Sequence, residues 1–165
     1  MILIAVVSEN RGLGFKGKLL YHIPEDLRHF RQLTVGGTVV MGRKTLESLP
    51  GGRPLPDRKT IVLTRNSQFY CDGAEICHSA EELPPETAGE RYYLCGGGEI
   101  YRLLLPRCGE AWITDVRGRP EADTFLPEMT LQNGWIPVEI GRWQTSGNEE
   151  YRFVHYLHKG TDKNE

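Results

Sequence analysis

The sequence predicts a single α/β domain built on a mainly parallel sheet. Five apolar segments of strand length alternate with segments of helical character, and this alternation is typical of α/β folds. The expected strands lie near residues 2–8, 38–41, 59–64, 91–95 and 111–117, and the expected helices lie near 24–34, 44–49, 79–83 and 98–105. Two further strands, near 136–143 and 150–158, are joined by the hairpin signal TSGNEE, so we expect the sheet to end in an antiparallel edge.

Length and charge limit the possible functions. The 165 residues suffice for one domain with a sizeable core, which we place at residues 1–159, followed by a disordered tail at 160–165. The 20 basic and 22 acidic residues indicate neither a nucleic-acid partner nor a membrane partner. The apolar start MILIAVV is too short to span a bilayer and has no signal-peptide features, so we expect it to be the first strand.

The cysteines and histidines do not predict a metal site. Cys71, Cys77, Cys95 and Cys108 have no metal-binding spacing. We expect reduced, structural thiols, which indicates a cytoplasmic location.

The stretch YHIPEDLRHFRQLT, residues 21–34, places an acid inside an apolar helix face. Pro24 suits the first helical position. At about 100° per residue, an apolar face forms from Ile23, Leu27, Phe30 and Leu33. Asp26 falls within this face, whereas the neighbouring acid, Glu25, points away and complements the helix dipole. An unpaired buried carboxylate is costly, so Asp26 needs a partner, which a bound ligand can supply.

Three expected strand ends carry residues suited to binding anions. They are VVMGRKT, with Gly42, Arg43, Lys44 and Thr45; YYLCGGGEIY, with three glycines; and IVLTRN, with Arg65. Each alone has a structural interpretation, as a turn or a solvated charge. Because ligands bind beyond the carboxyl ends of parallel strands, the three together favour a ligand with several phosphates, such as a dinucleotide. No G-x-G-x-x-G follows the first strand, which argues against a Rossmann domain.

Seven segments in order resemble the dihydrofolate reductase family, over nearly the whole chain. They are IAVVSENRGLG, IPEDLRHFR, VVMGRKTLESL, RPLPDRKTIVLT, LCGGGEIY, ITDV and ADTFLP. The resemblance implies a three-layer fold with a mostly parallel eight-stranded sheet and helices on both faces. It also implies hydride transfer from NADPH to C6 of 7,8-dihydrofolate, with protonation of N5, which yields tetrahydrofolate for one-carbon metabolism. Antifolate small molecules are implied as further ligands, and a monomer is expected.

The resemblance also implies roles for residues around the substrate. Asp26 is expected to bind the pterin 2-amino group and N3 and to support protonation of N5. Thr114 joins this polar cluster, and Arg58 binds the α-carboxylate of the glutamate tail. Tyr21 and Leu19 complete the catalytic set, and Leu19 belongs to a loop, residues 9–23, that is expected to close over nicotinamide. The substrate-binding residues are Ile4, Ala5, Val6, Asp26, Leu27, Phe30, Leu49, Leu55, Arg58, Cys95, Tyr101 and Thr114.

For NADPH, the resemblance places cations around the 2′-phosphate and backbone N–H groups around the pyrophosphate. Arg43, Lys44 and Arg65 serve the 2′-phosphate, and a cis peptide is expected at Gly96–Gly97. Thr45 and the N–H groups of residues 97–100 serve the pyrophosphate, and Ala5 and Leu13 contact the carboxamide through their backbones. The cofactor-binding residues are Ala5, Leu13, Gly14, Leu19, Gly42, Arg43, Lys44, Thr45, Leu63, Thr64, Arg65, Cys95, Gly97, Gly98, Glu99, Ile100 and Tyr101.

Three positions depart from the family pattern, and two other functions stay open. Tyr21 replaces a usual tryptophan, Leu20 a frequent proline, and Glu99 an arginine found in some relatives, so Glu99 either weakens NADPH binding or complements the helix dipole. One alternative is a reductase of the riboflavin pathway on the same scaffold, against which Asp26 and Arg58 argue. The other is a non-catalytic nucleotide-binding protein.

Overall fold

A nine-stranded sheet forms the centre of the part of the chain that the structure, a computed structural model, describes, residues 1–161. Its strand order is β10-β12-β8-β1-β7-β4-β5-β6, and β11 also pairs with β12. The strands are β1 (Ile2–Ser8), β4 (Thr38–Gly42), β5 (Lys59–Leu63), β6 (Ala74–Cys77), β7 (Tyr92–Leu94), β8 (Glu110–Val116), β10 (Trp135–Ile140), β11 (Gln144–Ser146) and β12 (Glu149–His158). From β8 to β6 every pairing is parallel, and β12 pairs antiparallel with β8, β10 and β11.

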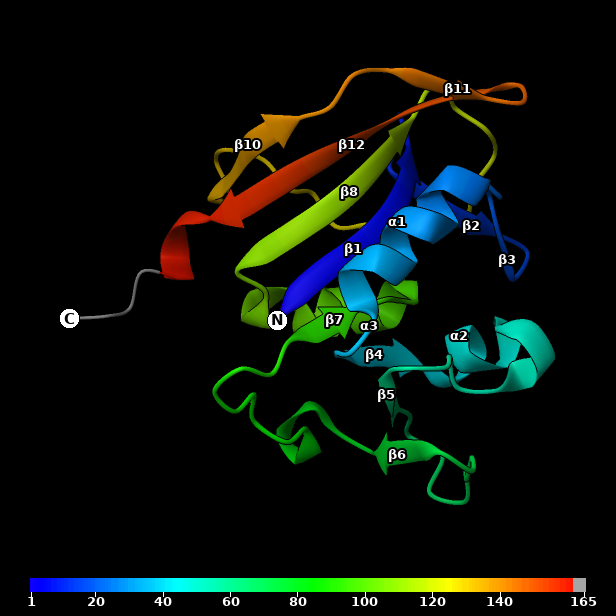
Figure 1. The fold of residues 1–165 in the computed structure, drawn as a ribbon, viewed down its shortest axis with the longest axis vertical. Helices are drawn as coiled ribbons and strands as arrows, with labels where there is room; N and C mark the ends of the chain where they lie inside the picture. Colours follow the sequence, from blue (N-terminus) through cyan, green and yellow to red (C-terminus); the bar gives the residue numbers. More distant parts are fainter. Residues whose placement is uncertain (162–165) are drawn as a thin grey trace.

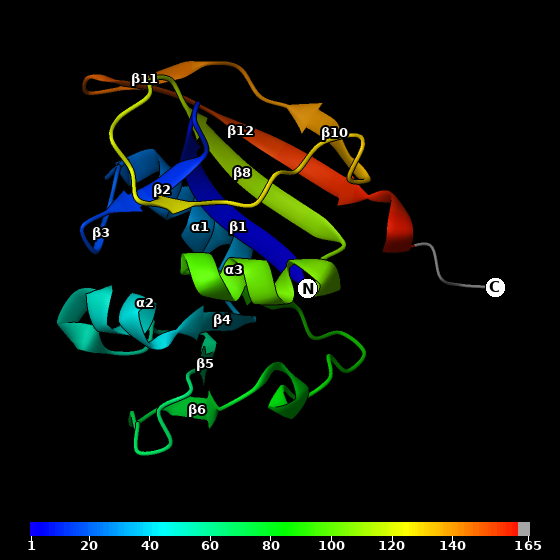
Figure 2. The same cartoon turned by 180° about the vertical axis from the view of Figure 1, so that it is seen from behind.

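Helices cover both faces of this sheet. α1 lies in front of β1 and β8 in Figure 1, and α3 lies in front of the sheet when the molecule is seen from behind in Figure 2. The helices are α1 (Pro24–Thr34), α2 (Arg43–Ser48) and α3 (Gly98–Leu104), and the 3-10 turns are η1 (Pro50–Gly52), η2 (Ala80–Glu82), η3 (Leu105–Arg107) and η4 (Lys159–Thr161). The expected three-layer α/β fold with an antiparallel edge is therefore confirmed.

A small second sheet forms where the sequence predicts only a long loop. Its order is β3-β2-β9, with β2 at Gly12–Phe15, β3 at Lys18–Leu19 and β9 at Thr124–Phe125. The strands are two to four residues long and contain two glycines, so no alternating apolar pattern announces them. This pairing ties the 9–23 segment to the segment before residue 126.

Other differences from the predicted elements lie at the sheet edges. The helix expected near 79–83 is only the 3-10 turn η2, and it follows the edge strand β6, which the sequence did not reveal. The strand expected at 136–143 is β10, which ends at Ile140, and the sequence did not reveal β11, which follows it. Both strands pair with β12. Gly160 and Thr161 of the expected tail lie in η4, and 162–165 lie outside the described residues.

Both faces of the central strands are buried, which explains the unbroken apolar sequence of β1. Leu3 packs in one apolar cluster with Val40 and Leu94, and these three side chains are fully buried. Ile4 packs in a second cluster, with Met41 and other residues. Because successive side chains of a strand point to opposite faces, the two clusters lie on the two sides of the sheet.

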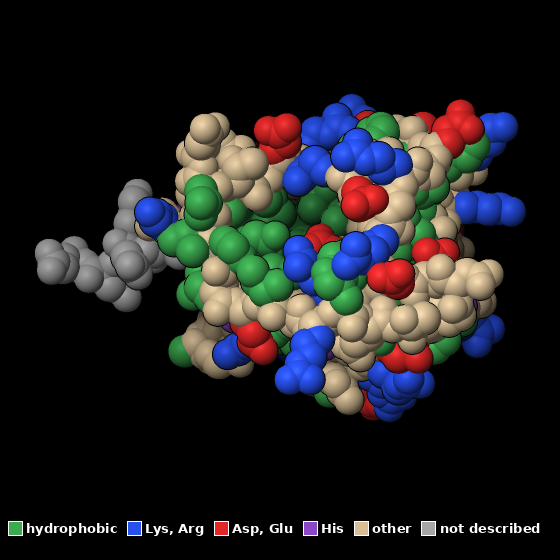
Figure 3. Space-filling model, turned by 90° about the horizontal axis from the view of Figure 1, so that it is seen from above, with side chains coloured by type: hydrophobic (Ala, Val, Ile, Leu, Met, Phe, Trp, Pro, Cys, Tyr) green, Lys and Arg blue, Asp and Glu red, His purple; other side chains and the backbone are tan. Residues whose placement is uncertain are grey.

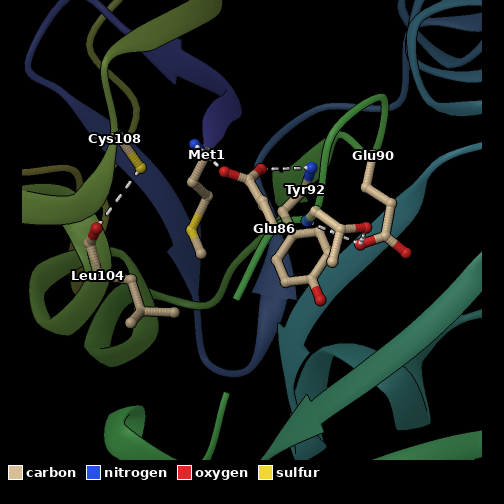
Figure 4. A network of polar contacts seen from close by, with 7 residues as sticks. Met1, Glu86, Glu90, Tyr92, Leu104 and Cys108 are labelled. Atoms are coloured by element: carbon tan, nitrogen blue, oxygen red, sulfur yellow. Dashed lines mark hydrogen bonds and ion pairs between the residues drawn. The ribbon is translucent and has the colours of Figure 1, made fainter. Parts of the chain in front are cut away.

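The carboxylate of Glu86 ties down the chain before β7. It accepts hydrogen bonds from the amino group of Met1 (3.0 Å) and from the backbone N–H of Tyr92 (2.7 Å), as Figure 4 shows. In the same view the Cys108 thiol donates to the carbonyl of Leu104. These contacts lie where β1 and β7 begin. They leave the other end of these parallel strands, where the strands finish, available for a binding site.

The surface mixes charges of both signs. Seen from above, basic and acidic side chains lie close together around a hollow that contains hydrophobic side chains (Figure 3). This mixture agrees with the near balance of 20 basic and 22 acidic residues. Among the helices of residues 1–161, none has the length and apolar character needed to cross a bilayer.

Because β7 is buried, shortening one of its side chains is expected to destabilise the fold. Leu94 is fully buried, so Leu94→Ala is expected to lower the free energy of unfolding by about 2–5 kcal/mol, because it removes apolar contacts and leaves a void. Leu131 is 68% exposed, and the matched change Leu131→Ala is expected to alter stability by no more than about 0.5 kcal/mol. Urea denaturation followed by circular dichroism measures both; similar losses at the two positions would contradict the assigned core.

Candidate active site

A cavity of about 890 Å³ lies where β4, β5 and β6 end and α3 begins. It is lined by Gly42, Arg43, Lys44, Thr45, Leu63, Thr64, Arg65, Asn66, His78, Ser79, Gly97, Gly98, Glu99, Ile100, Arg102, Leu103, Asp123 and Thr124. The structure thus brings the three predicted anion-binding strand ends together at one site, because parallel neighbouring strands end at the same edge.

The glycine triplet lets the backbone reach this cavity. Gly96 has a φ of +120°, a backbone conformation that residues other than glycine rarely adopt. The peptide bond from Gly96 to Gly97 is cis, as the resemblance implies. A Cβ atom at Gly98 would lie 2.6 Å from the Thr124 side chain. Since a side chain cannot fit there, glycine is required for α3 to start so close to β9.

The charges around the cavity are mostly positive. Four cations line it, Arg43, Lys44, Arg65 and Arg102, against two acids, Glu99 and Asp123. The Asp123 carboxylate already accepts hydrogen bonds from the Lys16 N–H and the Thr124 hydroxyl. The remaining positive charge suits a ligand with phosphate groups.

Asp26 and Thr114 form a polar pair between α1 and β8. The Thr114 hydroxyl donates a hydrogen bond of 2.6 Å to Oδ1 of Asp26. Burial raises the pKa of Asp26, and the hydrogen bond from Thr114 opposes this rise. Within the described residues no lysine or arginine forms an ion pair with Asp26, so its other oxygen is available for a ligand.

The predicted apolar wall residues divide between the two clusters on opposite faces of the sheet. Ile4, Phe30, Leu49 and Cys95 share one apolar cluster. Ala5, Leu13 and Tyr101 belong to the other large cluster, together with Ile100.

Tyr101 lies between the Asp26 pair and the cavity. Its hydroxyl donates a bond of 2.6 Å to the Ile4 carbonyl. Its pKa is raised by burial and then by the neighbouring Cys95 and Asp26. The Cys95 thiol has a pKa raised to about 12 by burial, so it stays neutral. Tyr101 follows Ile100, which lines the cavity, so the cavity and the Asp26 pair are adjacent parts of one site.

Arg58 is held by two contacts near the end of α1. Its Nε donates to the Pro56 carbonyl (2.8 Å), and its Nη1 donates to the buried Thr34 hydroxyl (3.2 Å). Burial and the nearby Arg31 lower the pKa of Arg58, while Asp57 raises it. Because these contacts use Nε and Nη1, the Nη2 group of Arg58 can donate hydrogen bonds to an anionic ligand group. Leu55, in the same connection, is half-buried.

The comparisons with known proteins agree with this geometry. A model of the dihydrofolate reductase family matches residues 1–158. The chain belongs to the dihydrofolate reductase family. Dihydrofolate reductase of Staphylococcus aureus (strain Mu50 / ATCC 700699) is 32% identical over 150 residues, 90% of this chain and 92% of the relative. Dihydrofolate reductase type 3 of Salmonella typhimurium is 38% identical over 138 residues, 83% of each chain.

A solved member of the family shares the fold. Dihydrofolate reductase from Enterococcus faecalis, complexed with NADP(H) and RAB-propyl, superposes with a TM-score of 0.84 at 31% identity. The superposition covers 96% of this chain and 95% of the other.

Other predicted site residues lie on α1, β1, β2 and β3. Leu19, in β3, is 79% exposed, and Leu27, in α1, is 50% exposed. Gly14 lies in β2, opposite Leu19, and Val6 packs beside Tyr21 in a third apolar cluster. Their predicted contacts with ligands stay predictions.

Tyr21 lies in the third apolar cluster, near the ends of β1 and β8. Tyr21 packs against Ile23, Val116 and Tyr151. Its pKa is raised by burial and by Glu149 and Glu9, and the Ser8 side chain opposes this rise. Its hydroxyl therefore lies near the end of β1 and the hairpin before β12, and within residues 1–161 it makes no hydrogen bond to Asp26 or Thr114. Its catalytic role stays a prediction.

The sequence did not identify seven residues that line the cavity. Asn66 and Arg102 each follow a predicted site residue directly, and Leu103 follows Arg102. Extending each predicted segment by one or two residues would have included them. His78 and Ser79 follow β6, whose short edge pattern gave no strand signal. Asp123 and Thr124 lie in the segment ADTFLP, which contributed to the resemblance but carried no assigned role.

The hydrogen bond between Thr114 and Asp26 predicts a change in titration. Thr114→Val removes a donor that favours the charged carboxylate, so the pKa of Asp26 is expected to rise further, whereas Thr114→Ser keeps the hydroxyl and is expected to leave it close to the parent's. The pH dependence of the Asp26 carboxyl ¹³C shift, measured by NMR without ligands, checks this. Identical titration curves for Val and Ser would contradict the role of this bond.

Proposed function

We propose that this protein is a working dihydrofolate reductase, which uses NADPH to reduce 7,8-dihydrofolate to 5,6,7,8-tetrahydrofolate. One observation carries the proposal: a partly buried aspartate without a cation partner in the described chain lies beside a positively lined cavity at the strand ends. Family membership supports both the reaction and the cofactor. The chemistry is oxidation of NADPH coupled to reduction of the pterin.

The residues of the cavity fit NADPH. Arg43, Lys44 and Arg65 supply positive charge for the 2′-phosphate, while Thr45 and the backbone N–H groups near Gly97 supply donors for the pyrophosphate. When bound, NADPH supplies the hydride. Ala5 and Leu13, both buried beside Tyr101, are proposed to position the carboxamide through their backbones.

Asp26 is proposed to bind the substrate and to support protonation of its N5. Its free oxygen can accept hydrogen bonds from the pterin 2-amino group and N3, and Thr114 fixes the other oxygen. Because burial raises its pKa, the Asp26 carboxyl group is a better proton source near neutral pH than an exposed aspartate. Apolar walls formed by Ile4, Phe30 and Leu49 hold the ring and limit the access of water, so that the reacting atoms are aligned.

Arg58 is proposed to bind the α-carboxylate of the glutamate tail. Thr34 and Pro56 hold its guanidinium, which leaves donors for a carboxylate. Leu27, in α1, and Leu55, shortly before Arg58 in the sequence, are proposed to supply apolar surface for the middle of the substrate. The same site is proposed to accept antifolate small molecules, and the protein is proposed to be a cytoplasmic monomer, in keeping with its four free cysteines.

A spectrophotometric assay tests the function directly. NADPH absorbance is expected to fall when dihydrofolate is added, and a diaminopyrimidine inhibitor is expected to stop the fall. Oxidation of NADPH with a ribose-phosphate pyrimidine instead of dihydrofolate would indicate the riboflavin-pathway reductase. Binding of NADPH without oxidation by any pterin would indicate a non-catalytic protein.

Removing the acid of the site is expected to stop the reaction. Asp26→Asn should lower the turnover of dihydrofolate at neutral pH by about 10²–10⁴-fold, because the group that supports protonation is lost. Affinity for NADPH, measured by quenching of protein fluorescence, should stay close to the parent's. Glu25→Gln, which changes the adjacent acid of the same helix, is the matched control and should keep the parent's turnover. Unchanged turnover in Asp26→Asn would remove the assigned role of this residue.

The loss in Asp26→Asn is not expected to come from unfolding. The pKa of Asp26 is raised in the folded chain, so its contribution to stability is present at low pH and is lost as pH rises through the folded pKa. At neutral pH the amide replaces an unfavourable buried charge, so urea denaturation should find the variant at least as stable as the parent.

The cations of the cavity are expected to set the cofactor preference. Replacing Lys44 and Arg65 together with Ser should reduce the preference for NADPH over NADH by about ten-fold, since only NADPH carries the 2′-phosphate that these side chains would bind. Steady-state kinetics with both cofactors measures the preference. Arg142→Ser, an exposed cation that does not line the cavity, serves as the control. An unaltered preference in the double variant would mean that the 2′-phosphate binds elsewhere.

A further inference from the structure

An ion pair joins two walls of the cofactor cavity. Nη2 of Arg65, in the loop after β5, lies 3.7 Å from Oε2 of Glu99, in the first turn of α3. Both residues line the cavity, and both side chains are largely exposed, at 90% and 80%. The pair therefore lies where a ligand entering the cavity meets solvent.

Glu99 differs from the other acids near these cations. Arg43 pairs with Glu47 (3.0 Å), which does not line the cavity. Asp123 lines the cavity, but its oxygens accept hydrogen bonds from Lys16 and Thr124. Within the described residues, Glu99 is thus the acid that both lines the cavity and pairs with one of its cations.

A phosphate that binds Arg65 competes with the Glu99 carboxylate for the guanidinium. An exposed ion pair contributes only about 0–1 kcal/mol, so a group with more negative charge can displace it. The displaced carboxylate stays on the same helix turn, close to the phosphate, and like charges repel. Glu99 therefore opposes phosphate binding twice: it occupies Arg65 before binding and repels the phosphate afterwards.

We propose that Glu99 is a specificity-determining residue that lowers the preference for a 2′-phosphorylated dinucleotide by competing with its phosphate for Arg65. This inference rests on the proposed function, because it takes NADPH as the occupant of the cavity. The carboxylate acts selectively: NADH occupies the same cavity but brings no 2′-phosphate to Arg65. A competitor of this kind weakens the binding of NADPH and NADP⁺ alike.

The charge-neutral variant Glu99→Gln tests the proposal by a direct measurement of binding. Quenching of protein fluorescence is expected to show about two- to five-fold tighter binding of NADPH and of NADP⁺, whereas the affinity for NADH should change much less. The gain should shrink at high salt, where exposed charges are screened. Glu139→Gln, which removes an exposed acid that does not line the cavity, is the matched control and should bind NADPH like the parent.

A double-mutant cycle with Arg65→Gln separates competition from simple repulsion. If Glu99 competes for Arg65, the gain in NADPH affinity from Glu99→Gln should be smaller in the Arg65→Gln background, where only the repulsion between Glu99 and the phosphate remains. An equal gain for NADPH and NADH in both backgrounds would overturn the proposal, since it would show general repulsion of the shared diphosphate. Weaker binding of both cofactors in Glu99→Gln would also overturn it and would assign Glu99 to the start of α3.

Failure of this inference is distinguishable from failure of the proposed function. The parent protein with dihydrofolate and NADPH decides the function, whatever the variants show. If the parent oxidises NADPH with dihydrofolate but Glu99→Gln leaves the affinity for NADPH unchanged, only the role of Glu99 is wrong. Circular dichroism of each variant confirms that the fold is kept.

Discussion

The hydrogen bond from Thr114 to Asp26 is the interaction on which the site depends. It links α1 to β8, which β1 separates from β7, the strand that leads into the glycine triplet. A carboxylate placed among apolar side chains is unfavourable for folding, and its raised pKa reflects this. The fold tolerates the charge because Thr114 stabilises one oxygen, and the other oxygen is kept for chemistry. Stability and reactivity are thus set by the same atom pair.

The site divides its tasks between two chemically different regions. The cavity at the strand ends is lined by cations from α2, α3 and the loop after β5, whose long side chains can adjust to the phosphates of a flexible cofactor. The region around Asp26 is formed by side chains of α1, β1 and β8, which are packed and rigid. Rigid elements suit the alignment of reacting atoms, and exposed cations suit reversible binding. Glu99 belongs to the first region and adjusts binding without contact with the reacting atoms.

The match between prediction and structure follows the strength of the local pattern. β1 and α1 have the expected bounds because a long apolar run and a proline-started apolar face are strong local signals. β6 and the β2–β3 hairpin were missed because short edge strands have little to bury, so their sequences carry little alternation. The pair of Asp26 and Thr114 came from family resemblance, since no local pattern joins residues 88 positions apart. Family resemblance has a limit as well: it assigned Tyr21 a place in the pattern but did not reveal that its side chain lies near Ser8.

The sequence by itself determined the α/β class, the anion-ready strand ends and the odd position of one acid in an apolar helix face. Such features are local: they depend on the periodicity of apolar residues and on the backbone freedom of glycine. Only the tertiary structure decided that the three strand ends form one cavity, that Arg58 rests on Thr34 and that Glu99 reaches Arg65. These contacts join distant segments, and their geometry is set by the packing of the whole sheet and not by neighbours along the chain.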